Sequence, residues 1–228
     1  MVHIFDFGAK KLSFESSRLR GRIATLLMLL LPILITIISM TLSLSRLLPS
    51  TNPYVSIIFV IPSYASYILF LAAMNGLANY YNEPKIFKNS LYPFIISSSA
   101  GITSLIVAYT FITPILDQLS AYITSPGNVP PTSIFLSFFQ VVAFIWLAVS
   151  FIAILNGIFY RRAFYALAEK SGEQNFKQAG LFMFIGGVLM IIIVGGLIFF
   201  IGLIFAILGF FSVKPKASQN HSPSETPN

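Results

Sequence analysis

Long uncharged stretches alternate with short charged segments along this chain. Residues 23–45, 47–82, 89–116, 118–160 and 178–213 contain no Asp, Glu, Lys, Arg or His. A helix needs about 20 apolar residues to cross a hydrocarbon core of about 30 Å, so each stretch is long enough to form a membrane span. Strands of a membrane barrel would alternate apolar and polar residues over about 10 positions, and no such alternation appears. The pattern therefore predicts an all-α, polytopic membrane helical bundle.

The last stretch, residues 178–213, decides the number of spans. Its 36 residues would form a single helix of about 54 Å at about 1.5 Å per residue, which is too long for one crossing. The pair Gly195–Gly196 lies near the middle, and glycine accepts the backbone angles of a tight turn. We therefore predict two short helices joined at this pair, for a total of six transmembrane helices, with five as the alternative.

Polar segments set the remaining boundaries. We expect a basic cytoplasmic segment at residues 1–22, a transmembrane domain at residues 23–213 and a disordered cytoplasmic tail at residues 214–228. The first four spans are predicted at residues 23–45, 54–81, 90–116 and 133–160, with an irregular connection at residues 117–132.

The fourth helix is expected to continue past the membrane to about Lys170. Gly172 is a plausible stop for it, because glycine often ends helices. Ser171 and Gln174 have the spacing of a capping box for the next helix.

Composition and charge agree with a membrane location. The chain is 56% hydrophobic and 9% charged, whereas soluble domains carry about 25% charged residues. With six spans, 13 of the 14 Lys and Arg residues fall on one side and only Arg46 on the other. The positive-inside rule makes the basic side cytoplasmic, so both termini are predicted there. The net charge of +7 is thus explained by topology, and no nucleic-acid partner is expected.

Catalytic chemistry lacks its usual residues in this sequence. No Asp, Glu, Lys, Arg or His lies near the centre of a span, both histidines (His3 and His221) lie in the tails, and cysteine is absent. Such groups mark proton relays and metal sites in membranes. We therefore predict no catalytic, cofactor-binding or metal-binding residue, no cofactor, and a protein that is not an enzyme.

The last third of the chain carries a recognisable pattern: Phe159-Tyr160-Arg161-Arg162, then residues 167–173, Ala179-Gly180-Leu181, Ile185-Gly186 and Phe210-Phe211-Ser212. Over about residues 159–214 this resembles an uncharacterised family of archaeal and bacterial membrane proteins, catalogued as domain of unknown function 996. The family has no established activity, so the resemblance implies a prokaryotic membrane location and no functional residue.

Two functions remain open. The first is a non-catalytic scaffold or accessory subunit that binds lipid or protein partners or its own copies. Its basic residues would either contact anionic lipid head groups or act only as topology determinants, and the pattern favours the second role. These residues are Lys10, Lys11, Arg18, Arg20, Arg22, Arg161, Arg162, Lys170 and Lys177.

The second is a channel or facilitator for a small neutral solute, lined by uncharged polar side chains: Asn75, Ser97, Ser98, Ser99, Thr103 and Asn156. Convergence of these side chains on one cavity would favour this function. Trp146 lies mid-span, and we expect its indole N–H to bind a carbonyl or hydroxyl between helices.

Overall fold

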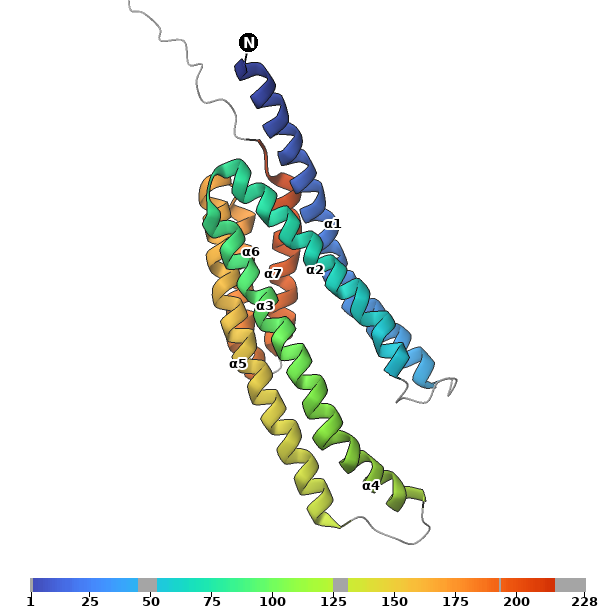
Figure 1. Ribbon diagram of the computed structural model, residues 1–228. Helices are drawn as coiled ribbons and strands as arrows, with labels where there is room; N and C mark the ends of the chain where they lie inside the picture. The colour runs from blue at the N-terminus through green and yellow to red at the C-terminus, as the bar shows by residue number, and fades with distance from the viewer. Residues whose placement is uncertain (1, 45–52, 125–130, 193, 216–228) are drawn as a thin grey trace, which may run out of the picture.

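The computed structural model describes residues 2–44, 53–124, 131–192 and 194–215, and all regular structure in these ranges is helical (Figure 1). The elements are α1 (Val2–Leu44), α2 (Pro53–Tyr81), α3 (Pro84–Val107), the π-turn η1 (Ala108–Ile112), α4 (Thr113–Thr124), α5 (Thr132–Ser171), α6 (Gln174–Leu189), the 3₁₀ turn η2 (Met190–Ile192) and α7 (Val194–Ser212). Six helical segments are long and apolar enough to cross a membrane, with α3, η1 and α4 forming one of them. The predicted all-α bundle with six candidate spans is confirmed.

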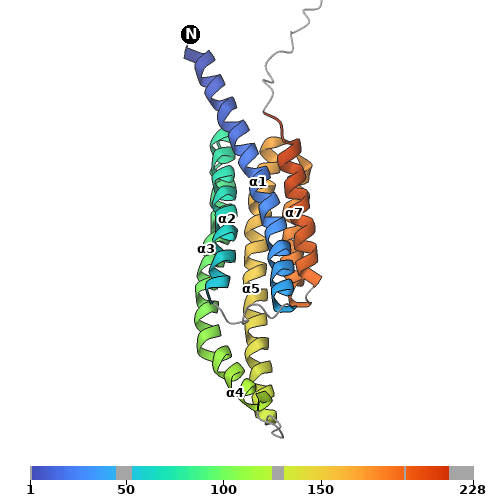
Figure 2. The same cartoon turned by 90° about the vertical axis from the view of Figure 1, so that its right-hand side faces the viewer.

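The six long segments form a ring of antiparallel neighbours in chain order, and α7 closes the ring by packing against α1. α1 packs along α2, α6 packs along α7, and α5 lies between α3 and α6 (Figures 1 and 2). α1 includes the basic stretch up to residue 22 and continues without a break into the first candidate span.

One end of the bundle, which we call the charged end, gathers the start of α1, the α2–α3 turn, the α5–α6 turn and the end of α7 (Figure 1). Contacts join these segments: Arg18 Nη1 donates to the Val213 carbonyl at 3.2 Å, and Lys170 Nζ lies 3.4 Å from a Glu83 carboxylate oxygen. Every Lys and Arg among the described residues belongs to a segment at this end. The start of α1 and the end of α7 thus share one side, as an even number of spans requires.

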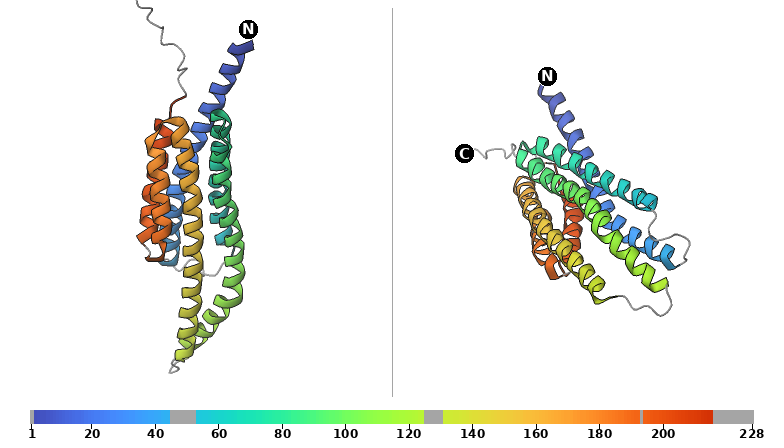
Figure 3. Two further views of the ribbon diagram at one scale, coloured as in Figure 1. Left: turned by 90° about the vertical axis from the view of Figure 1, so that its left-hand side faces the viewer. Right: turned by 60° about the horizontal axis from the view of Figure 1, so that its bottom comes forward.

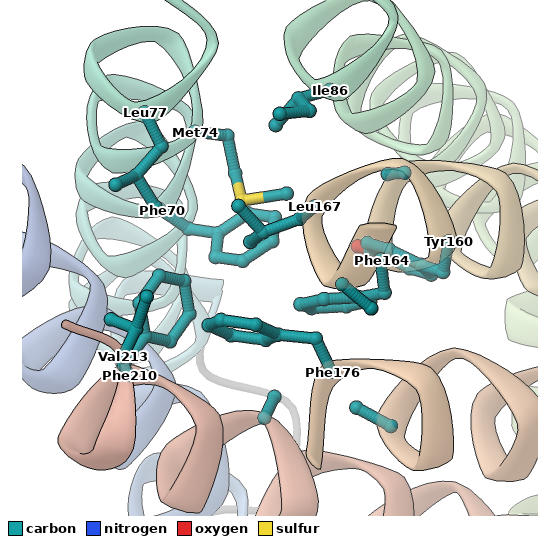
Figure 4. Packing of buried hydrophobic residues seen from close by; sticks show 14 of the residues in the cluster. Phe70, Met74, Leu77, Ile86, Tyr160, Phe164, Leu167, Phe176, Phe210 and Val213 are labelled. Carbon is teal, nitrogen blue, oxygen red and sulfur yellow. The ribbon is translucent and has the colours of Figure 1, made fainter. Parts of the chain in front are cut away.

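Aromatic rings from four helices form the core next to the charged end (Figure 4). Phe70 of α2, Tyr160 and Phe164 of α5, Phe176 of α6 and Phe210 of α7 are each no more than 4% exposed. The Phe164 and Phe176 rings stack with centroids 5.9 Å apart, and Phe176 meets Phe210 edge-on at 5.1 Å. Such stacked and edge-to-face pairs are the arrangements that aromatic rings prefer, and here they join α5, α6 and α7.

Two short turns at the charged end follow from local sequence. Asn82 has φ 51°, which asparagine tolerates, and Pro84 then begins α3, where its missing N–H costs nothing. Gly172 ends α5 with φ 74°, which confirms the predicted stop. The predicted capping box is wrong: Glu173 caps α6 by accepting from the Asn175 backbone N–H at 3.2 Å.

The third span differs from its predicted bounds. Its helix begins at Pro84, six residues before the expected start, and α4 continues to Thr124 through the first half of the expected connection at residues 117–132. The π-turn Ala108–Ile112 interrupts the span. Pro114 explains it, because a proline cannot donate to the carbonyl four residues earlier and its ring clashes there, so an inserted residue relieves the clash.

The predicted turn at Gly195–Gly196 is wrong in position. α6 ends at Leu189, the 3₁₀ turn Met190–Ile192 follows, and both glycines lie in the first turn of α7, with neither at positive φ. Gly195 is required for a different reason, because a Cβ there would collide with the Gly186 carbonyl and the Met190 nitrogen. Gly196 faces open space. The first glycine serves close helix packing and the second does not.

Candidate functional site

Four basic side chains from three helices line one groove at the charged end. Lys85 and Lys88 come from α3, Arg162 from α5 and Lys177 from α6, around a volume of about 1130 Å³. A single carboxylate, that of Glu169, also lines the groove. The four cations are exposed, so the groove is an open, positively charged surface.

Helical spacing explains why these side chains meet. α3 contributes residues spaced three, four and seven apart, which lie on one face of a helix: Lys85, Lys88, Asn89 and Tyr92. α5 contributes a matching stripe: Phe159, Arg162, Ala166 and Glu169. Because α3 and α5 pack side by side, the two stripes face each other, and Lys177 of α6 closes the third side.

Aromatic rings place apolar surface beside these charges. The Tyr92 and Phe159 rings join α3 to α5 with centroids 4.7 Å apart. Lys177 Nζ lies 5.9 Å from the centre of the Tyr165 ring. The groove can therefore contact both an anionic group and a hydrocarbon segment attached to it.

The predicted head-group residues on α5 and α6 separate into three settings. Arg162 and Lys177 enter the groove. Arg161 instead packs its guanidinium over the Tyr165 and Phe184 rings, at 5.3 and 5.1 Å, and Lys170 pairs with Glu83. Lys85 and Lys88 were not among the predicted head-group residues, because they lie between the predicted spans 54–81 and 90–116. Their spacing after Pro84, the first residue of α3, was the available signal.

The basic residues of α1 have mixed roles. Arg22 donates from Nε to the Phe210 carbonyl at 3.0 Å and from Nη2 to the Phe211 carbonyl at 3.1 Å. With Arg18 on Val213, two arginines thus satisfy carbonyls that the end of α7 leaves without helical partners. Arg20 is exposed, and the side chains of Lys10 and Lys11 lie outside the described part of the structure.

The polar candidates for a solute path converge only in part. Asn156 Nδ2 donates to Ser97 Oγ at 2.9 Å, and Asn156 Oδ1 is buried without a protein partner. Ser97 and Ser98 line a pocket of about 280 Å³ between α2 and α3.

A second polar contact adjoins that pocket. The hydroxyl of Tyr67, which also lines it, bonds to that of Tyr160. Asn75, Ser99 and Thr103 are exposed on the outside of the bundle instead. Three of the six candidates therefore come together and three do not.

Trp146 behaves as predicted. Its indole N–H donates at 3.1 Å to the carbonyl of Ile191, in the 3₁₀ turn between α6 and α7. Among the described residues, no three His, Cys, Asp or Glu side chains cluster.

Comparison with known proteins assigns the chain to a protein family. Residues 62–204 match the family described as "Protein of unknown function (DUF996)". The chain belongs to this family. The match begins at residue 62, about 100 residues before the segment 159–214 that carries the resemblance, and it includes both α3 and α5 of the groove.

A curated relative is similar to most of this chain. The chain is 25% identical over 150 residues to "Uncharacterized protein MJ1644" of Methanocaldococcus jannaschii. The aligned segment covers 65% of this chain and 77% of the relative. No solved structure matches the chain.

Proposed function

We propose that this DUF996 protein is a non-catalytic, multi-pass protein of the archaeal or bacterial cell membrane that binds anionic lipid head groups. In this role it acts as a scaffold or accessory subunit rather than as an enzyme. The observation that carries the proposal is the groove in which Lys85, Lys88, Arg162 and Lys177 converge from three helices.

The chemistry of the groove suits a phospholipid better than a soluble anion. Basic residues near a membrane surface attract anionic lipid by about 1 kcal/mol each. The aromatic pair Tyr92–Phe159 lies on the membrane side of Lys88 and Arg162 along the two helices, where the lipid's glycerol and upper chain would rest. By the positive-inside rule the charged end is cytoplasmic, so both termini are assigned there.

Binding of a short-chain phospholipid to the purified protein in neutral detergent tests the proposal. A phosphatidylglycerol should bind more tightly than the matching phosphatidylcholine. The double substitution Arg162→Gln with Lys177→Gln removes two charges worth about 1 kcal/mol each, so the dissociation constant should rise roughly 30-fold.

A matched control uses an arginine outside the groove. Arg20→Gln removes an exposed charge from the same end and should leave the dissociation constant within about twofold of the parent. Equal weakening by Arg20→Gln would reduce the effect to general attraction, and equal binding of phosphatidylcholine would refute the head-group site. Competition by inorganic phosphate alone would point to a soluble anion instead.

A facilitator for a small neutral solute is the second candidate. It is favoured by the contact of Asn156 with Ser97 beside the pocket that Ser98 and Tyr67 also line. Proteoliposome swelling in glycerol tests it, with Asn156→Leu against Asn75→Leu on the outer surface. A facilitator predicts faster swelling than in empty liposomes and loss of that gain only in Asn156→Leu.

A further inference from the structure

α6 and α7 are each long enough by residue count to be candidate spans, but measured from the charged groups at their ends they reach less far than the thickness of a hydrocarbon core. From Lys177 at the charged end to Ile191 at the tip, α6 and η2 rise about 21 Å, and from Phe210 back to Val194 α7 rises about 24 Å, at about 1.5 Å per residue. Phe210 lies at the same depth in the bundle as the charged Arg22, because Arg22 Nε donates a hydrogen bond to the Phe210 carbonyl. A hydrocarbon core of about 30 Å therefore extends about 6–9 Å beyond the tip if the charged groups lie at its near surface.

The side chains at the tip are suited to hydrocarbon and not to water. Ile191, Ile192 and Val194 are 51%, 58% and 49% exposed, and Leu197 is 70% exposed. No residue from 189 to 201 is charged or has a polar side chain. A turn in water would normally carry Gly, Asn, Asp, Ser or Pro at its bend, and an exposed cluster of this kind would be unfavourable there.

The neighbouring helix gives an independent measure of depth. The hydrogen bond from Trp146 to Ile191 sets the tip level with the middle of α5. Exposed apolar side chains continue along α5 for eleven residues past Trp146, or about 16 Å, through Phe144 and Phe139 to Phe135. Figure 3 shows α6 and α7 ending well short of the far end of α5. Lipid that covers this part of α5 must also lie beyond the tip.

Among the described residues of the tip, two backbone groups that leave the regular α-helical pattern have partners within the protein. Backbone polar groups at membrane depth need partners within the protein or in a water-filled cavity, because hydrocarbon offers none. The 3₁₀ turn continues the backbone bonding past the end of α6, and the Trp146 indole N–H binds the Ile191 carbonyl. A tryptophan in mid-span is thereby explained as the partner of this turn.

From these observations we infer that α6 and α7 form a re-entrant hairpin. The hairpin enters from the charged end, turns inside the hydrocarbon core and returns. Its tip contacts the acyl chains of the opposite leaflet, and these chains also cover the far half of α5. The chain then crosses the membrane fully four times, and both termini stay on the same side. This inference does not rest on the head-group groove.

The single tryptophan makes the tip depth measurable in the unmodified protein. The protein is reconstituted into bilayers that carry a quencher in the head group, in the middle of the acyl chain or near the chain end. A re-entrant tip predicts that Trp146 fluorescence is quenched several-fold more by the acyl-chain quenchers than by the head-group quencher or by external iodide. Dominant quenching by the head-group probe or iodide would place the tip at the surface. No quenching by any lipid probe would mean that protein covers it, and either result would overturn the inference.

Site-specific labelling provides a second test that exploits the absence of cysteine. Ile192→Cys places a thiol at the tip, and Ser133→Cys places one in the first turn of α5, beyond the apolar surface. In intact cells a membrane-impermeant maleimide should label Ser133→Cys at least tenfold faster than Ile192→Cys. Equal labelling of the two from outside would show that the hairpin crosses the whole membrane and would refute the re-entrant assignment.

Discussion

The two halves of α5 show how differently the protein uses equally apolar sequence. All buried residues of this helix lie at or after Ser150, and the half nearest the charged end packs Phe164 against Phe70 and Phe176. In the other half, Phe139 and Phe144 are 65% and 70% exposed. The half nearest the charged end contacts α2, α3, α6 and α7, whereas most side chains of the other half are exposed.

Hydropathy does not distinguish these halves, because lipid tails are as apolar as a protein core. The packed half of α5 and the helices beside it are marked instead by small residues that let backbones approach. A Cβ on Gly157 would lie 3.0 Å from the Met183 carbonyl, and one on Gly202 would lie 2.9 Å from the Met183 nitrogen. Close packing and aromatic contacts hold the bundle together near the charged end, and the far half contributes length.

The strongest test of this contrast makes the same substitution in both halves of one helix. Phe164→Ala removes a ring with no exposed surface and leaves a cavity among Phe70, Tyr160 and Phe176, which should cost about 3 kcal/mol or more. Phe144→Ala removes a ring that is 70% exposed and should cost less than about 1 kcal/mol. Thermal unfolding in detergent measures both. Comparable losses would mean that the far half of α5 is also packed, against a partner outside the chain.

Adjacent glycines offer a sharper comparison at the hairpin. Gly195→Ala forces a methyl group into the Gly186 carbonyl and the start of η2, so we expect a loss of about 1–3 kcal/mol. Gly196→Ala meets nothing within 4 Å and should be neutral or raise stability by up to about 1 kcal/mol, since alanine favours helix. The melting temperatures of the two variants should therefore move apart. Equal behaviour would contradict the close α6–α7 packing.

Much of this fold follows from the sequence, because long uncharged runs allow little besides membrane helices. The number of candidate spans, the end of α5 at Gly172 and the bond made by Trp146 were all predictable. The position of the hairpin turn was not, because both sides of the break are apolar. Gly195 is there because α7 packs closely against Gly186 of α6, and the turn itself lies at Met190–Ile192.

The groove was only half predictable for a different reason. Arg162 and Lys177 stand out as basic residues at helix ends, but their neighbours Arg161 and Lys170 look the same in sequence and face other partners. Which face of α5 meets α3 depends on packing between distant segments. Lys85 and Lys88 join the site only because α3 begins at Pro84, earlier than the apolar run indicates.

Substitutions of two arginines at the charged end test whether the hydrogen bonds and ring contact of a charged side chain stabilise the bundle there. Arg22→Gln leaves two carbonyls of α7 without their donor and removes a contact 4.5 Å above the Phe211 ring, so we expect a loss of about 1 kcal/mol. Arg20→Gln, on the exposed face of α1, should change the unfolding free energy by less than about 0.5 kcal/mol. If the two variants have the same melting temperature, the contact of Arg22 with α7 contributes nothing measurable to the stability of the bundle at the charged end.

The smallest expected effect lies at the boundary between the two halves. Trp146→Phe keeps a ring beside the hairpin but removes the indole N–H that binds the Ile191 carbonyl. Hydrogen bonds between membrane helices contribute about 0.6 kcal/mol on average, so the loss should be of that order, somewhat more if the carbonyl is left without any partner in hydrocarbon. Tyr109→Phe, which removes a hydroxyl from a ring that is 79% exposed, is the control and should have no measurable effect. A tip immersed in water would let solvent replace the indole, and Trp146→Phe would then match the control; a measurable difference in bilayers is what a dry turn requires.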